Sequence, residues 1–462
     1  MAERIGMNTS DVRRHADTMR AYTSQLDHVA TQVDETAENS RRRLLAAIPA
    51  LIVPLPWVKA AAGGAIVMSW ASMELAKNAA VDIRSAAEAA QQLLGRLGVN
   101  ITEQISASSA TEGYHDGLPS RARAEELYRR AMNDPSVLAD LSPMQVSAWW
   151  DRLTKAEQDA FIAAHHWVAG NTNGIPFARR IEANQLNAAE LLSKGTVDPS
   201  SNEYAYLMEV ANGERTLVSF DPANDRIIEM IGQITERTND IVSYVPGTTS
   251  DMQGFYDLGT QQLGQFLVDN AAPPGSTVAF VFKDAEFPTF GADGVYHSSW
   301  AASVGDPYHR FQQALSLENP GKIPVTSIEH SFGSSVGGYA EIQGTRFDTR
   351  IVLAGAGMTD EWKPAAGTDY YSMTGSDDII RAAREKYSED LNTGYQHAPT
   401  SKNGFVELDP KLPAWNPGAY VGTGGLRSDP GMDPITQHTT IATADPAKNG
   451  VALQYMLDII AR

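Results

Sequence analysis

Serine, histidine and aspartate side chains that could build a nucleophilic site lie in the last third of the chain. Residues 333–337 read G-S-S-V-G and match the G-x-S-x-G pattern of a serine on a sharp strand-to-helix turn. Glycine suits both flanks because a Cβ would obstruct the close approach of strand and helix. A β-rich run at 325–329 precedes the motif, so we predict Ser335 as the nucleophile; the alternative is an ordinary β–α turn.

A serine hydroxyl needs a base, and in this arrangement the acid and the histidine follow the serine in the chain. Only His397 and His438 lie downstream. We predict His438, which stands just before a C-terminal helix expected at about 446–460. His397 lies inside a long connection and is the second choice, and either histidine could instead be a solvent-exposed loop residue.

The carboxylate that would orient the histidine is predicted in the loop after the β-rich run 370–373. Asp377 and Asp378 both stand there, and either could accept the histidine Nδ1–H and stabilise imidazolium. We choose Asp378, because two apolar residues follow it and can anchor the loop. Asp377 could then cap the next helix.

Two backbone N–H groups are predicted to form an oxyanion hole. One is that of Val336, which follows the predicted nucleophile, and the other is that of Thr248 in the P-G-T-T-S loop at 246–250. A simple Pro-Gly turn is the alternative for that loop.

Short β-rich runs alternate with helical stretches after about residue 215. The first two runs flank a hairpin turn at 221–225, and the later runs are separated by helices, which predicts a mostly parallel, doubly wound α/β sheet. The predicted strands are 216–220, 226–231, 241–245, 277–282, 325–329, 349–354 and 370–373, with helices at about 252–268 and 310–317.

The first hundred residues differ from the rest in charge and in period. They carry a net charge of about +1, and the remainder carries about −20. We predict a helical hairpin over 1–101, a linker and helix over 102–140, and the α/β domain over 141–462 with a lid-like insertion at about 381–432. The apolar run 44–70 contains Lys59 and several prolines, so we expect a buried turn there and no membrane span.

Composition excludes several classes of function. The net charge of −19 over 462 residues disfavours nucleic acid as a partner, and the absence of cysteine excludes disulfides and a thiolate nucleophile. The chain has no phosphate-binding G-x-x-x-x-G-K-[ST] loop, no complete dinucleotide fingerprint and no histidine pair at metal-binding helical spacing. We therefore predict neither a cofactor nor a metal.

Further motifs resemble an actinobacterial α/β-hydrolase family long catalogued as a domain of unknown function. They are the pair Trp149-Trp150, G-N-T-N-G-I-P at 170–176, R-R-I-E-A-N at 179–184 and V-P-G-T at 245–248. The resemblance covers roughly residues 140–440 and implies a serine hydrolase with Ser335, Asp378 and His438 as nucleophile, acid and base. The family usually has Asp-Pro-Ile where this chain has Asp378-Ile379, which keeps Asp377 open as the acid.

The N-terminal hairpin is similar in layout to the helical hairpins exported by type VII (ESX-type) secretion. Trp57 stands near the turn, although no glycine follows two residues later and no Tyr-x-x-x-Asp/Glu signal is present. We expect a carboxylesterase or lipase-like serine esterase acting on a small-molecule or lipid ester, cytoplasmic or exported without a Sec signal. The alternative is a type VII-secreted interaction or toxin-like protein with an inactive hydrolase fold, whose hairpin self-associates or binds a protein partner.

Overall fold

The computed structural model describes residues 121–289, 299–319, 321–390, 395–415 and 431–462. All of them belong to Leu118–Arg462, the second of the two compact units into which the chain divides. The predicted hairpin over 1–101, the apolar run 44–70 and the predicted linker up to residue 120 lie outside the described residues.

An eight-stranded sheet forms the centre of this unit, with strand order β1-β2-β4-β3-β5-β6-β7-β8. β2 pairs antiparallel with β1 and with β4, and the other neighbours are parallel. The strands are β1 (Thr216–Asp221), β2 (Arg226–Ile231), β3 (Asp240–Val245), β4 (Thr277–Lys283), β5 (Val325–His330), β6 (Thr349–Leu353), β7 (Asp369–Met373) and β8 (Val406–Leu408). The predicted hairpin followed by a parallel α/β sheet is confirmed.

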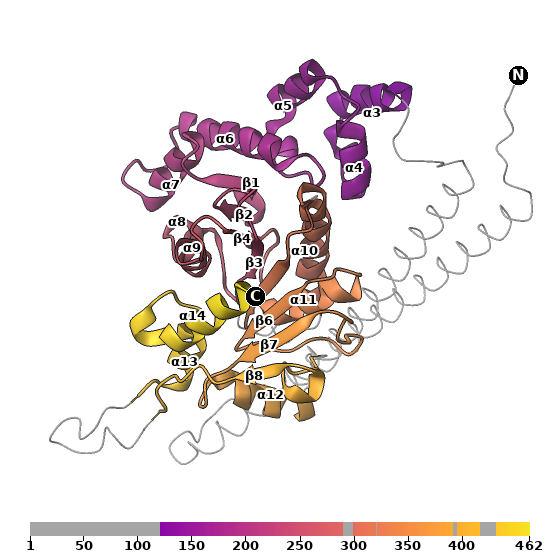
Figure 1. Cartoon of the computed structure of the whole chain (residues 1–462). Coiled ribbons are helices and arrows are strands. Elements are labelled where there is room, and N and C mark those ends of the chain that lie inside the picture. The colour runs from indigo at the N-terminus through magenta and orange to yellow at the C-terminus, as the bar shows by residue number, and fades with distance from the viewer. Residues whose placement is uncertain (1–120, 290–298, 320, 391–394, 416–430) are drawn as a thin grey trace, which may run out of the picture. The chain divides into compact units, whose positions relative to one another are not determined.

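Helices cover both faces of the sheet, which is why β4 is buried along its whole length (Figure 1). One core joins the sheet to α7 (Asn202–Ala211), α8 (Met252–Tyr256), α9 (Gln262–Asp269) and α14 (Pro446–Ile460). The opposite core joins it to α10 (Ser299–Glu318) and α11 (Gly333–Ile342). The single helix predicted over 252–268 is two helices, because Leu258 takes a left-handed conformation between them (φ 59°).

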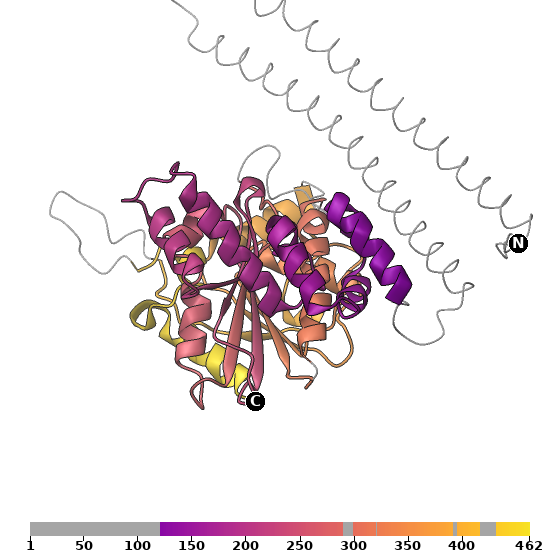
Figure 2. The same cartoon turned by 90° about the horizontal axis from the view of Figure 1, so that it is seen from above.

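The N-terminal helices of the unit lie over the β1 edge of the sheet, in the foreground of the view from above (Figure 2). They are α3 (Arg121–Asn133), η1 (Pro135–Leu138), α4 (Pro143–Trp150), α5 (Lys155–Ala169) and α6 (Phe177–Ser193). Ser142 and Thr154 begin α4 and α5 with capping boxes. Trp149 and Trp150 are buried and pack edge-on against Phe161, so the tryptophan pair is a core feature.

The segment predicted as a lid-like insertion, about 381–432, contributes to the sheet as well. It includes most of α12 (Ile379–Asp390), the short η3 (Ser401–Asn403) and β8, which pairs parallel with β7. Sequence analysis did not predict β8, because three residues with two exposed side chains give no apolar period. Within the described part of the chain, no helix has the length and apolar character needed to cross a membrane.

Candidate active site

Three side chains from three separate segments of the chain meet at the carboxyl end of the parallel strands. The ring of His438 lies between the other two: its Nδ1 is 2.8 Å from Asp378 Oδ1, and its Nε2 is 3.0 Å from Ser331 Oγ. Nδ1–H donates to the carboxylate, which leaves Nε2 to accept the hydroxyl proton. The structure thus brings Asp378 and His438 together, but with Ser331 as the serine.

Ser331 occupies the sharp turn between β5 and α11. Its backbone is left-handed (φ 54°), a strained conformation for serine, and its N–H donates to Leu353 O at 2.9 Å. Gly333 allows the turn to pass close to β3, since a Cβ there would stand 2.5 Å from Val245 O. A left-handed serine and a glycine at a close backbone approach are the properties expected of a nucleophile on a sharp strand-to-helix turn.

Ser335, the predicted nucleophile, is not at this turn. It lies inside α11, one helical turn beyond Ser331, and its buried Oγ donates to Gly357 O at 2.6 Å. The G-x-S-x-G pattern predicted the turn four residues too late in the chain. Centred on Ser331, the pattern would need a glycine at position 329, where this chain has Glu329. One signal was available in the sequence: Ser331 follows the predicted strand almost directly and has Gly333 two residues after it.

The backbone N–H groups that could bind an oxyanion differ for Ser331 and Ser335, because one of them belongs to the residue that follows the serine. The Val336 N–H donates to Phe332 O within the helix at 3.4 Å, so the prediction that it is a free donor is wrong. The N–H of Phe332, which follows Ser331, has no partner among the described residues. The same holds for the N–H of Thr248, in the loop whose Gly247 would bring a Cβ to 3.1 Å from Ser331 Cβ.

His330 is hydrogen-bonded to the backbone of His438. Its Nε2–H donates to His438 O at 2.9 Å, and the two rings lie 5.0 Å apart. Burial, with a smaller contribution from His438, lowers the pKa of His330 to about 4. His330 is therefore neutral at pH 7 and acts as a donor that fixes the position of His438. Sequence analysis missed it because it considered only histidines downstream of the serine.

The acid loop separates its two aspartates clearly. Asp378 is buried, and its Oδ1 also accepts from Ile380 N at 2.9 Å, whereas its Oδ2 has no hydrogen-bond partner. Asp377 is partly exposed and accepts from Trp415 N at 3.0 Å, a contact that lowers its pKa. His438 belongs to α13 (Pro434–Thr440) rather than to a loop, and His397 instead contacts Asp360 O at 3.2 Å.

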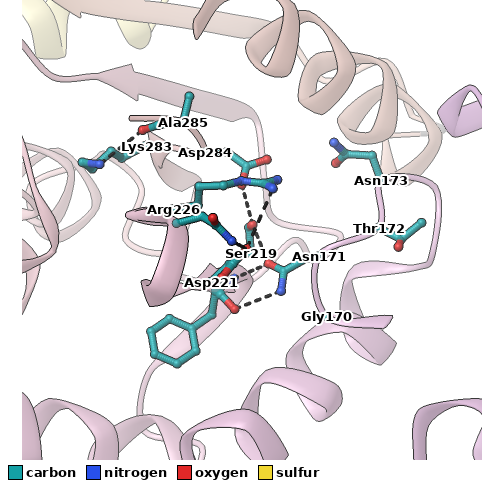
Figure 3. Close-up of polar contacts among 12 residues, drawn as sticks. Gly170, Asn171, Thr172, Asn173, Ser219, Asp221, Arg226, Lys283, Asp284 and Ala285 are labelled. Carbon is teal, nitrogen blue, oxygen red and sulfur yellow. Dashed lines mark hydrogen bonds and ion pairs between the residues drawn. The ribbon is translucent and has the colours of Figure 1, made fainter. Parts of the chain in front are cut away.

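A second polar cluster stands at the same end of the sheet, nearer its β1 edge (Figure 3). Asp284, directly after β4, is buried and lies 3.0 Å from Arg226 Nη2 and 2.7 Å from Ser219 Oγ. Asn171 Oδ1 stands 2.9 Å from the same hydroxyl and accepts from Phe220 N at 2.7 Å. Arg226 and Asn171 also line a cavity of about 920 Å³. Among the described residues, no histidine stands beside Ser219 in this cluster; the carboxylate that accepts its hydrogen bond, Asp284, is paired with Arg226.

No set of three or more histidine, aspartate and glutamate side chains suited to a metal occurs among the residues that the structure describes. At the Ser331 site the groups available for chemistry are side chains and backbone N–H donors. A hydroxyl, an oriented imidazole and free N–H donors are the components of acyl transfer.

Residues 221–387 match the sequence model of a family described as alpha/beta hydrolase. That segment runs from the end of β1 into α12 and includes Ser331 and Asp378, while His438 lies beyond it. Together with the sheet topology, the match identifies the protein as a hydrolase with the α/β-hydrolase fold. No curated protein is found to match the chain.

Solved structures with remote similarity include other hydrolases. TT1662 from Thermus thermophilus is 14% identical, with 50% of this chain and 93% of that chain covered and a TM-score of 0.28. The Francisella virulence factor BioJ is 11% identical, with 62% and 92% covered and a TM-score of 0.32. Thermogutta terrifontis esterase 2 is 10% identical, with 42% and 81% covered and a TM-score of 0.26. Similarities this low carry no information about the substrate.

Proposed function

We propose that the protein is a serine esterase that forms an acyl intermediate on Ser331. The observation that carries this proposal is the position of His438, which lies within hydrogen-bond distance of both Ser331 Oγ (3.0 Å) and Asp378 Oδ1 (2.8 Å). Ser331 takes the role that sequence analysis gave to Ser335, whereas Asp378 and His438 keep theirs. The left-handed backbone of Ser331 supports the assignment, because strain of this kind clusters at functional residues.

The reaction follows from the contacts of each group. His438 Nε2 takes the Ser331 proton while Oγ attacks the ester carbonyl carbon, and Asp378 stabilises the imidazolium. The same proton then passes to the alkoxide leaving group as the C–O bond breaks, which gives acyl-Ser331 and an alcohol. Water, deprotonated by His438, hydrolyses the acyl-enzyme and restores the serine.

The oxyanion would be held by the N–H groups of Phe332 and Thr248. Phe332 follows Ser331 in the chain, and Thr248 follows Gly247, which lies close to Ser331. Neither N–H has a hydrogen-bond partner among the described residues. The N-terminus of α11 adds a favourable field for negative charge at that point. Removal of one such donor typically costs about 10²-fold or more in kcat.

The substrate class is a small-molecule or lipid ester, as expected for a carboxylesterase or lipase-like enzyme. An ester suits the site because an alkoxide leaves more readily than an amide nitrogen does, and His438 can supply the proton that it takes up. The N-terminal 1–101 segment, as a type VII-like export or interaction module, stays a proposal. Comparing acyl-chain preference and membrane partitioning with and without residues 1–100 tests it, and equality in both would leave the segment without a role there.

Labelling with a fluorophosphonate probe tests the nucleophile. Wild-type protein should become labelled on Ser331, and Ser331→Ala should abolish labelling. Ser335→Ala is the matched control, four residues away in the same helix-turn region, and should still be labelled. Labelling that survives Ser331→Ala would overturn the assignment. An unlabelled, folded wild type would favour the alternative of an interaction or toxin-like protein with an inactive hydrolase fold.

A further inference from the structure

A buried ionic network lies directly beneath the turn that carries Ser331. It consists of Glu329 on β5, Arg350 on β6 and Glu341 on α11, and we refer to it as the Arg350 network. Arg350 binds both carboxylate oxygens of Glu329, with Nε at 2.9 Å from Oε1, and its Nη1 stands 2.6 Å from Glu341 Oε2. All three side chains are buried.

Every charged atom of the Arg350 network has a partner. Ser327 Oγ donates to Glu329 Oε1 at 2.7 Å, and Glu341 accepts from Trp362 Nε1 at 2.6 Å and from Tyr370 OH at 2.7 Å. Burial raises the pKa of Glu329, and Arg350 opposes this. Buried ion pairs of this kind seldom stabilise a fold more than well-packed apolar residues would, so stability alone does not account for the network.

The position of the network relative to Ser331 suggests what it does. Glu329 precedes Ser331 by two residues, and Arg350 Nη2 also donates to Ser334 O at 3.2 Å, three residues after Ser331. One guanidinium therefore connects the backbone segments on both sides of the turn. Its planar, five-donor geometry allows contacts that a lysine ammonium could not make together.

The glycine pattern of the turn is altered to make room for the network. In the G-x-S-x-G pattern, a glycine two residues before the serine lets strand and helix approach each other. This chain has Glu329 there, and the space for its carboxylate comes from Gly337 on α11, where any Cβ would overlap that carboxylate. The strand and the helix are thus joined through a carboxylate instead of packing backbone to backbone.

We infer that Arg350 and Glu329 are positioning residues that hold the Ser331 turn in its reactive geometry. This inference rests on the proposed function of Ser331. The Arg350 network fixes where Oγ stands relative to His438 Nε2, so its loss should slow the chemical step more than it weakens substrate binding.

The test compares two arginine–glutamate pairs, the fully buried Arg350–Glu329 and a control pair in which only the glutamate is buried. Arg215 and Glu229, joined at 2.7 Å, form the control pair, since Glu229 is buried on β2 and also accepts from Tyr206 OH at 2.8 Å. The variants Glu329→Gln and Arg350→Lys are compared with Glu229→Gln and Arg215→Lys. Each is measured for Tm, kcat, KM and the rate of fluorophosphonate labelling per folded molecule.

The Glu329→Gln and Arg350→Lys variants should lose about 10-fold to 100-fold in kcat and in labelling rate, with KM nearly unchanged, because small misplacements of reacting atoms cost that much. The control variants should lose Tm but keep kcat. Equal kcat in all four variants and wild type would overturn the inference. If the single variants fail to fold, the triple variant Glu329→Leu/Arg350→Met/Glu341→Gln, which leaves no unpaired charge in the network, should fold with reduced kcat. Wild-type kcat in it would likewise overturn the inference.

Including Ser331→Ala in the same series distinguishes a failure of the proposed nucleophile from a failure of the positioning role. Labelling that persists in Ser331→Ala overturns the proposed function itself. Loss of labelling in Ser331→Ala, combined with wild-type rates in Glu329→Gln and Arg350→Lys, overturns only the positioning role.

Discussion

Two constellations at the carboxyl end of the sheet combine a serine, an aspartate and a nitrogen-rich side chain. In one, Ser331 faces His438, which is oriented by Asp378 at 2.8 Å. In the other, Ser219 faces Asp284, which is paired with Arg226 at 3.0 Å (Figure 3). The residue types are similar, but only the first contains an imidazole, the side chain best suited to accept and return a proton near neutral pH.

The difference lies in protonation and in backbone strain. Arginine stays charged at all relevant pH values, so Arg226 can neutralise Asp284 but cannot accept the Ser219 proton. Ser219 lies within β1, whereas Ser331 stands on a left-handed turn. A serine beside an aspartate is therefore not a catalytic signal by itself. An intervening imidazole and a left-handed turn are what give the Ser331 constellation its chemistry.

The largest difference in kcat is expected between substitutions of His438 and of Arg226, the nitrogen-containing side chains of the two constellations. His438→Ala should lower kcat by about 10³-fold or more, because the serine loses its general base. Arg226→Gln should leave the kcat of the folded protein near wild type, although stability falls because Asp284 remains buried without its partner. Ester hydrolysis measured alongside thermal unfolding distinguishes these results. A large kcat loss in Arg226→Gln would give the second cluster a part in the reaction.

A comparison of aspartates comes next. Asp378→Asn should reduce kcat by about 10²-fold to 10⁴-fold, because the histidine loses the acceptor that fixes its tautomer. Asp284→Asn and Asp377→Asn should each have a much smaller effect, since neither carboxylate contacts His438. Steady-state kinetics on all three variants provides the check, and a greater loss in Asp377→Asn would transfer the acid role to that residue.

Two glycines differ in the space around them: Gly333 lies in a crowded turn, and Gly450 lies in a helix with open space beside it. Gly333→Ala should cost about 2 kcal/mol of stability, because its Cβ would meet the backbone oxygen of Val245 at 2.5 Å and force the turn to shift. It should also slow labelling of Ser331. Gly450→Ala in α14 has no atom within 4 Å of its Cβ and should stabilise the protein by about 0.5 kcal/mol. Urea unfolding of both variants measures the contrast, which is absent if Gly333→Ala is neutral.

The smallest effect on activity, but a distinct effect of pH, is expected at His330. Its folded-state pKa of about 4 lies below the ordinary value of 6.5, so the unfolded chain binds this proton first as the pH falls. The protein should lose up to about 3 kcal/mol of stability between pH 6.5 and 4 on this account. His330→Gln retains a donor for His438 O and should show a flatter pH profile. Equal slopes in chemical denaturation would remove His330 from the explanation.

Sequence patterns predicted most strands of the sheet because a strand that is buried on both faces is a nearly continuous apolar run in the sequence. The run at 277–282 is apolar throughout and became the fully buried β4, and the 221–225 turn became the β1–β2 hairpin. β8 could not be predicted, since it is a strand only through its pairing with β7. The break between α8 and α9 depends on the left-handed conformation of Leu258, and leucine is not a residue type that predicts a turn.

The candidate site was predicted in part, for a physical reason. Chain order and the end of a strand restrict the choices to Asp378 and His438, which the structure brings together, whereas the serine beside His438 is Ser331 and not the predicted Ser335. The motif rule assumes that glycine provides the space between strand and helix. Here Gly337 and Arg350 provide it together, through contacts between residues far apart in the chain that no local pattern contains.

The Arg350 network also constrains how this sequence can change. Replacement of Glu329 by glycine would leave Arg350 charged and without its bidentate partner, and replacement of Gly337 first would be blocked by the carboxylate. Single steps from this arrangement toward the all-glycine turn therefore pass through impaired intermediates. Positions 329, 337 and 350 are expected to be inherited as a set, so that in a lineage carrying this turn they would be exchanged together or not at all.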